Sequence, residues 1–182
     1  ITNNTIDADR IGISAENSGS LTVSDNTIVL YNLQKQNSER GINFNGSYAS
    51  IINNNHITAS YYWNYGKYIY NTSSYSHASI NNNTIVMSAL LNSNSSWVDS
   101  NGVQLHDNNN MYYVRGISST DPLQITGNTI DLGGSEEVQA IEVNYYTGTQ
   151  TVSTSLFENN DISLYCHYNY GSNAGIRMTK YS

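Results

Sequence analysis

The chain is 182 residues long, has a formal net charge of −7 with only 12% charged residues, and is otherwise rich in Asn, Ser, Thr and Tyr. The absence of a basic run argues against nucleic acid as a partner, and no apolar stretch reaches the roughly 18 residues that span a bilayer, so no membrane insertion is expected. The one cysteine, Cys166, can form neither an internal disulfide nor a thiolate zinc site, and no metal site or cofactor is expected.

In chain order, the first feature is a motif that recurs six times: an apolar residue, Asn three positions later, and Ile two positions after the Asn. The copies are Ile1-Asn4-Ile6, Val23-Asn26-Ile28, Ile52-Asn55-Ile57, Ile80-Asn83-Ile85, Ile125-Asn128-Ile130 and Phe157-Asn160-Ile162. Two residues between inward-facing apolar positions cannot form a hairpin, but they can bend the chain by about a right angle, and Asn suits such a bend because it tolerates the left-handed conformation.

A second motif alternates with the first: a small residue, then two aliphatic positions separated by one variable residue. Its copies are Gly12-Ile13-Ser14-Ala15, Gly41-Ile42-Asn43-Phe44, the weaker Lys67-Tyr68-Ile69-Tyr70, Gly102-Val103-Gln104-Leu105, Ala140-Ile141-Glu142-Val143 and Gly175-Ile176-Arg177-Met178. Such short alternation indicates short strands, so each repeat is expected to hold three of them.

These repeats predict an all-β fold, a right-handed single-stranded parallel β-helix of about six coils. If each coil lies about 4.8 Å above the last, the asparagine amides form a hydrogen-bonded ladder and the isoleucines form the core. The ladder consists of Asn4, Asn26, Asn55, Asn83, Asn128 and Asn160.

The coils differ in length, and the excess is expected in loops near 58–77, 88–101 and 106–122. We expect residues 1–182 to form one β-helix segment. The sequence begins at a second-strand position and stops just after a first-strand motif, which favours an excerpt of a longer solenoid.

The paired motifs resemble, over nearly the whole chain, the right-handed parallel β-helix repeats of the pectate-lyase-like superfamily. That superfamily includes polysaccharide lyases and hydrolases, phage tailspikes, autotransporter passenger domains and other bacterial adhesins. The resemblance implies a structural role for the six ladder asparagines, but it does not define a function.

In enzymes of this superfamily, chemistry usually lies on the outer face of the first strand. The outward column predicted here is Ser14, Asn43, Gln104, Glu142 and Arg177. Glu142 and Arg177 are expected to be cross-strand neighbours that could serve a substrate, or simply form a surface salt bridge. His106, followed by Asp107, could act as a base, or could simply begin a polar loop. Glu136-Glu137 could bind a cation in a loop, but adjacent acidic residues in a loop are usually just solvated.

Family catalytic signatures are missing: Asn128-Thr129-Ile130-Asp131 breaks an Asn-Thr-Asp segment, and there is no Asp-Asp pair. The predicted register also offers no two carboxylates on one face with the spacing of an inverting glycosidase. Whether the chain is an enzyme stays open, with a non-catalytic role favoured and no residue assigned as catalytic.

Aromatic residues indicate a binding surface, because rigid rings with adaptable polar neighbours suit glycans or another copy of the same protein. The binding candidates are Tyr61, Tyr62, Trp63, Tyr65, Tyr112, Tyr113, Tyr145 and Tyr146. The alternative is that stacked tyrosines only cover the flank of the solenoid.

Three functions follow as hypotheses: an adhesive or structural stalk at the bacterial cell surface or outside the cell; a polysaccharide lyase, hydrolase or phage tailspike; and a subunit of a self-stacking extracellular filament. The first is favoured on composition.

Overall fold

The computed structural model describes residues 1–30, 40–46, 50–59, 65–71, 78–87, 90–91, 97–98, 113–120, 124–134, 137–146, 155–166 and 173–181. In these ranges the regular structure is β-strand, and no helix occurs. Nearly all of the strands belong to three parallel sheets.

The three sheets, called A, B and C here, each take at most one strand from every coil. Sheet A contains β3 (Thr22–Ser24), β6 (Ile51–Asn53), β9 (Ser79–Asn81), β14 (Gln124–Thr126) and β17 (Leu156–Glu158). Sheet B contains β1 (Thr5–Ala8), β4 (Thr27–Leu30), β7 (His56–Ala59), β10 (Thr84–Met87), β15 (Thr129–Gly134) and β18 (Asp161–Cys166). Sheet C contains β2 (Ile11–Ser18), β5 (Arg40–Gly46), β8 (Tyr65–Asn71), β13 (Tyr113–Ser119), β16 (Glu137–Tyr146) and β19 (Ala174–Tyr181).

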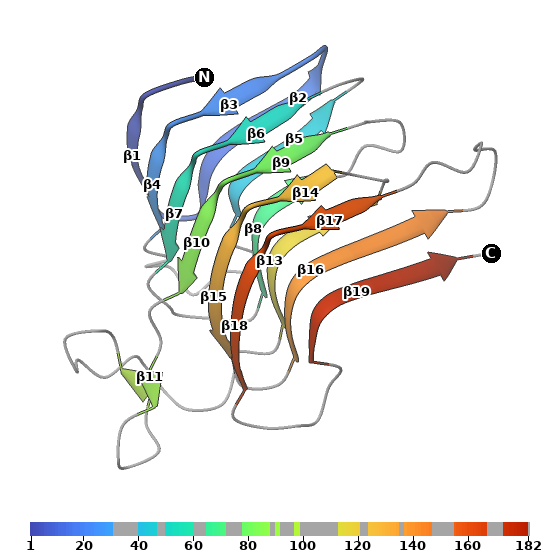
Figure 1. Ribbon diagram of the computed structural model, residues 1–182. Helices are drawn as coiled ribbons and strands as arrows, with labels where there is room; N and C mark the ends of the chain where they lie inside the picture. The colour runs from blue at the N-terminus through green and yellow to red at the C-terminus, as the bar shows by residue number, and fades with distance from the viewer. Residues whose placement is uncertain are drawn as a thin grey trace.

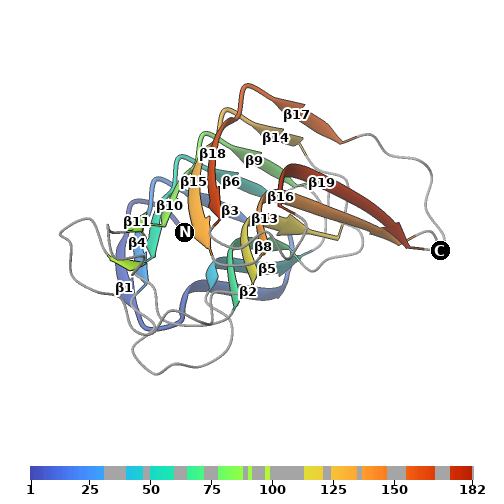
Figure 2. The same cartoon turned by 90° about the horizontal axis from the view of Figure 1, so that it is seen from below.

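The chain passes from sheet A to sheet B to sheet C in every coil and then begins the next coil, which makes a right-handed parallel β-helix of six coils (Figure 1). In the first coil, sheet A is represented only by the bridge of Thr2 to Ser24. Figure 2 shows the same stacking order in all three sheets. A small antiparallel pair, β11 (Leu90–Leu91) with β12 (Trp97–Val98), lies outside these sheets. The predicted fold class is therefore confirmed.

Between sheets A and B the chain turns at one residue in the left-handed conformation. That residue precedes the ladder asparagine in every coil; it is Asn3, Asp25, Asn54, Asn82, Gly127 or Asn159, and φ lies between 53° and 66°. Asn, Asp and Gly tolerate this conformation better than other residues. The strained position is thus the neighbour of the ladder asparagine, whereas the sequence pattern suggested the ladder asparagine itself.

The ladder asparagines form a continuous hydrogen-bonded column. The side-chain amide of each donates to Oδ1 of the asparagine in the next coil, at 2.9 Å for Asn4 to Asn26 and 3.0 Å for Asn83 to Asn128. The other three steps, from Asn26, Asn55 and Asn128, are 2.9 Å. The backbone N–H of each donor asparagine also donates to the same Oδ1. Burial of these amides is tolerated because the column satisfies them.

The core consists of three stacked apolar columns, one from each sheet. In sheet B, Ile28, Ile57, Ile85 and Ile130 are fully buried. Parallel columns run through Val23, Ile52, Ile80 and Ile125 of sheet A and through Ile42, Ile69, Ile117 and Ile141 of sheet C. Inward residues of the last coil are more exposed: Ile176 and Met178 are 45% and 55% exposed.

The strands of sheet C bend, as the curved β16 and β19 show (Figure 1). Gly41 and Gly116 lie immediately before the paired isoleucines, where sheets B and C approach closely. A Cβ on Gly116 would lie 2.6 Å from the Ala140 carbonyl oxygen and 2.8 Å from the Ile130 side chain. The residues before and at the isoleucine therefore both face the core, which bends the strand.

One strand of sheet C differs from the prediction. The strand between β8 and β16 is β13, with Gly116 and Ile117 in the motif positions, so the assignment of Gly102–Leu105 to this sheet was wrong. Residues 102–105 lie outside the described residues. The expected loop 106–122 accordingly contains a strand. The reason is that the second aliphatic position of the motif is Ser119, which is buried, so this segment does not match the apolar pattern.

Candidate functional site

The outer side of the bend in sheet C carries a continuous set of polar side chains. One position after the paired isoleucines lies the row Ser14, Asn43, Tyr70, Ser118, Glu142 and Arg177. Two positions before them lie Arg40, Arg115 and Gln139. We call these two rows together the sheet C polar face.

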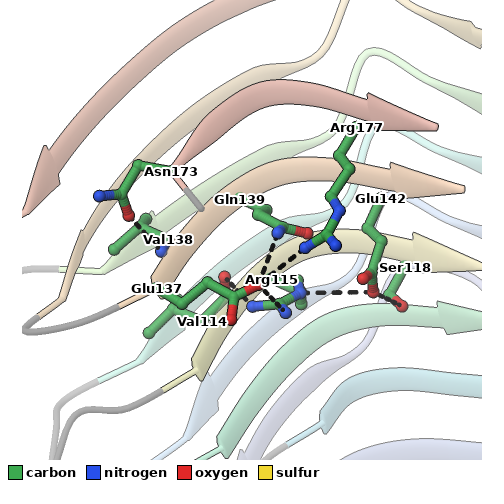
Figure 3. A network of polar contacts seen from close by, with 9 residues as sticks. All are labelled: Val114, Arg115, Ser118, Glu137, Val138, Gln139, Glu142, Asn173 and Arg177. Carbon is green, nitrogen blue, oxygen red and sulfur yellow. Dashed lines mark hydrogen bonds and ion pairs between the residues drawn. The ribbon is translucent and has the colours of Figure 1, made fainter. Parts of the chain in front are cut away.

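Arg115 is the centre of an ion-pair network (Figure 3). Its Nη2 donates to Glu137 Oε1 at 2.8 Å, and its Nε lies 3.3 Å from Glu142 Oε2. All three side chains are largely buried, with exposed fractions of 9%, 13% and 12%. Ser118 also donates to Glu142 Oε2, at 3.1 Å. A buried arginine requires such compensation because an unpaired buried charge is costly.

Glu137 connects this network to the last coil. Its Oε1 accepts hydrogen bonds from Gln139 Nε2 at 2.7 Å and Arg177 Nη1 at 3.0 Å, in addition to that from Arg115. Gln139 is fully buried, whereas the Arg177 side chain is 37% exposed. Glu137 therefore orients the guanidinium of Arg177 (Figure 3), while the Arg177 side chain stays partly exposed.

A second group of contacts occupies the coils nearer the N-terminus. The guanidinium of Arg40 lies 4.7 Å from the centre of the Tyr70 ring, and its Nη1 donates to Asn43 Oδ1 at 3.2 Å. Asn43 is buried and in turn donates to Ser14 Oγ at 3.3 Å. Side chains on the two sides of the bend thus converge, which explains how an outward-facing asparagine becomes buried.

The structure confirms that Glu142 and Arg177 are neighbours in register across β16 and β19. Their ion pairs are with other residues: Glu142 pairs with Arg115, and Arg177 pairs with Glu137. Glu137 and Glu142 both contact the guanidinium of Arg115, so the structure places a carboxylate beside Glu142 that the predicted register did not place there. The strand position of Glu137 also corrects its assignment to a solvated loop.

Half of the aromatic candidates, Tyr61, Tyr62, Trp63 and Tyr112, lie outside the described residues, as does His106. The backbones of the other four are described. Tyr65 begins β8 and pairs in register with Tyr113, which begins β13. Tyr145 and Tyr146 end β16.

Sequence reasoning missed Arg115, Glu137 and Arg40. A signal was present, because Arg-Gly-Ile occurs both at Arg40-Gly41-Ile42 and at Arg115-Gly116-Ile117. This tripeptide places an arginine two positions before the paired isoleucine in each case. Alignment on the tripeptide would have identified both β13 and the two arginines.

Within the described ranges, no group of three or more His, Cys, Asp or Glu side chains could hold a metal ion. The same part of the chain contains no helix with the length and apolar character needed to cross a bilayer. Comparison with family models, with curated proteins and with solved structures finds no significant match to this chain.

Proposed function

We propose that the chain is a segment of a secreted or bacterial cell-surface β-helix that serves as a rigid scaffold and binds glycans along the sheet C polar face. The repeats resemble those of pectate-lyase-like proteins and bacterial adhesins, and this resemblance supports the proposal. The observation that carries it is the outward row, which presents one polar residue per coil, at intervals of about 4.8 Å, in all six coils.

A linear glycan suits this arrangement because it is itself a repeating polymer with hydroxyl groups along its length. Ser14 and Arg177 offer hydrogen-bonding groups, and the Tyr70 ring is partly exposed. Aromatic rings with a polar edge are well suited to surfaces that are both apolar and wet. The ladder and the buried core keep the row straight, so little ordering entropy is lost on binding.

The proposal is tested by applying the purified chain to a glycan array and titrating each bound glycan by calorimetry. Tyr70→Ala and Arg177→Ala are expected to weaken binding about tenfold, which corresponds to about 1.4 kcal/mol. Thr27→Ala, on the exposed face of sheet B, is the matched control and is expected to leave affinity unchanged. Absence of any bound glycan, or equal losses in all three variants, would contradict the proposal.

The expected location is tested separately. An antibody raised against this chain should label intact cells of the source organism or detect the chain in culture medium. Labelling that requires permeabilised cells would contradict a surface or secreted location.

A second candidate function, polysaccharide cleavage, is favoured by one observation. Glu137 and Glu142 lie on either side of the same guanidinium, and glycosidases use two nearby carboxyl groups. The discriminating experiment incubates the chain with each bound glycan and measures new reducing or unsaturated ends. Release that disappears in Glu142→Gln would establish catalysis, and binding without release would favour the scaffold.

A further inference from the structure

The first and last coils each carry an outer edge of the three sheets. In the described part of the chain, β2 and β19 are the outermost strands of sheet C, and β1 and β18 are the outermost strands of sheet B. Sheet A ends at β17 on one side and at the bridge of Thr2 to Ser24 on the other. The two coils lie at opposite ends of the stack (Figure 1). Such edges are templates for pairing with another chain.

The asparagine ladder ends differently in these two coils. Inside the solenoid each ladder asparagine accepts hydrogen bonds from the preceding coil and donates to the following one. In the first coil, Oδ1 of Asn4 accepts no hydrogen bond from the described residues, although its amide donates to Asn26. In the last coil, Asn160 accepts from Asn128, but its backbone N–H meets no acceptor among the described residues. Within this part of the chain, one end therefore presents an acceptor and the other a donor, so each end complements the other and not itself.

Apolar columns that are buried inside the solenoid are exposed in these two coils. Ile176 and Met178 of β19 are 45% and 55% exposed, whereas Ile117 in the column of Ile176 is fully buried. In the first coil Ile1 is 50% exposed, whereas Val23, one coil further on, is fully buried. Covering these side chains with another coil would remove apolar surface from water and favour association.

The register inside the solenoid predicts which residues would meet if a first coil followed a last coil. Along sheet B, Leu164 occupies the position that Ala8 has in the first coil. Along sheet C, Met178 occupies the position of Ala15. Two large side chains would therefore meet two small ones, which suits the close packing of protein interiors.

The same register avoids electrostatic conflict. Charged residues of these edges whose side chains are described would each lie opposite an uncharged residue, whereas like charges directly opposite one another are destabilising. The pairs are Asp161 with Thr5, Ser163 with Asp7, Glu158 with Thr2, Arg177 with Ser14, and Thr179 with Glu16.

We infer that the coil of β17, β18 and β19 binds the coil of β1 and β2 of a second copy of this chain, head to tail and in this register. The backbone N–H and the side-chain amide of Asn160 donate to Oδ1 of Asn4 in the second copy, so the ladder continues between copies. Such a heterologous contact does not close on itself and builds linear assemblies along the solenoid axis. The contact requires no glycan, and it extends the sheet C polar face from one copy to the next.

The first experiment measures the mass of the purified chain by sedimentation velocity at concentrations up to about 0.1 mM, which covers dissociation constants in the micromolar range. Species that grow beyond a dimer as concentration rises are expected. A chain that stays monomeric would overturn the inference and leave these coils to another occupant. A dimer that never grows would also overturn it, because that behaviour indicates a symmetric contact.

Ile176→Lys is expected to weaken association at least about tenfold, because it places an unpaired charge in the contact. Ile51→Lys is the matched control: Ile51 is 43% exposed, but it lies on the outward side of β6, next to the inward Ile52 in the middle of the stack. It is expected to change association less than about twofold. Equal losses in the two variants would overturn the inference, since they would reflect general surface hydrophobicity.

Mixing two blocked variants tests the head-to-tail direction. Ile176→Lys blocks the last coil and Ile1→Lys blocks the first, so each variant alone is expected to be monomeric. Their mixture is expected to form a heterodimer and nothing longer, because each variant keeps the end that the other has lost. Absence of the heterodimer, with both variants folded by circular dichroism, would overturn the inference. The glycan array does not depend on this contact, so failure of either proposal can be recognised separately.

Discussion

The corner between sheets A and B and the bend of sheet C solve the same problem, turning the chain inside a coil, in different ways. At the corner every coil repeats one solution, a left-handed residue followed by a ladder asparagine, with amide-to-amide distances of 2.9 to 3.0 Å. At the bend the residue before the isoleucine varies. It is Gly in some coils, Ala in another coil, and the fully buried Tyr68 in the third coil.

The polar residues of the two regions also differ in how regularly they repeat from coil to coil. Ladder asparagines are interchangeable, since each makes the same bonds to the next coil. Residues of the sheet C polar face are individual, because Arg115 and Glu137 each have a partner set found in no other described coil. The repeated asparagines thus stabilise the solenoid, whereas the residues that differ from coil to coil lie on the face that we propose for binding.

The largest effect is expected from removing a central rung of the ladder. Asn83→Ala removes the Oδ1 that accepts from the backbone N–H and the side-chain amide of Asn55, and it removes the amide that donates to the Ile52 carbonyl. Unsatisfied buried groups cost about 1–3 kcal/mol each, so a loss of about 3–5 kcal/mol is expected in urea unfolding followed by circular dichroism. The control is Asn4→Ala at the exposed end of the ladder, which should cost about 1 kcal/mol. Equal losses of unfolding free energy in the two variants would show that burial does not determine how much a ladder asparagine stabilises the protein.

A smaller effect is expected from uncoupling the ion-pair network. Glu137→Gln removes the carboxylate that accepts from Arg115, Gln139 and Arg177, and leaves a buried arginine with one acidic partner fewer. A loss of about 2–3 kcal/mol is expected. The same substitution at the exposed Glu158 should change the free energy of unfolding by less than about 0.5 kcal/mol. If the two variants unfold at the same urea concentration, the network contributes nothing to stability.

The smallest effect concerns the bend. In Gly116→Ala the new methyl group would meet the Ala140 carbonyl oxygen at 2.6 Å, and backbone cannot move aside easily. A loss of about 1–2 kcal/mol is expected from this overpacking. Gly175→Ala is the matched control, because its nearest neighbours would be Ile162 side-chain atoms at 3.9 and 4.0 Å. Comparison of the two melting temperatures tests why glycine occurs before the isoleucine. A larger loss in Gly116→Ala would show that the reason is the close approach of the sheets and not the flexibility of glycine.

The ladder could be predicted because it depends on one residue type at a constant place in a short motif. Asn128 was identified although it lies 45 residues beyond Asn83, since the motif around each is the same. The fourth strand of sheet C could not be found in this way. Gly102–Leu105 matches the apolar pattern better than Gly116–Ser119, and only pairing with β8 and β16 distinguishes them.

The candidate site was predicted only in part. Glu142 and Arg177 were found because they occupy the variable position of a recognised motif. Glu137 was not, because it follows another glutamate at a strand end, and its partner Arg115 is 22 residues away. Neither residue shows its role until the coils are stacked.

The amino-acid sequence alone therefore determined the number of coils, the ladder and the apolar columns, because short hydrogen-bonded corners and inward isoleucines depend on local spacing that recurs in every repeat. Tertiary structure decided which segment fills the fourth coil and which charges meet. Those outcomes depend on the bend of sheet C, which brings side chains from different coils together on its outer side, and no local pattern encodes that contact.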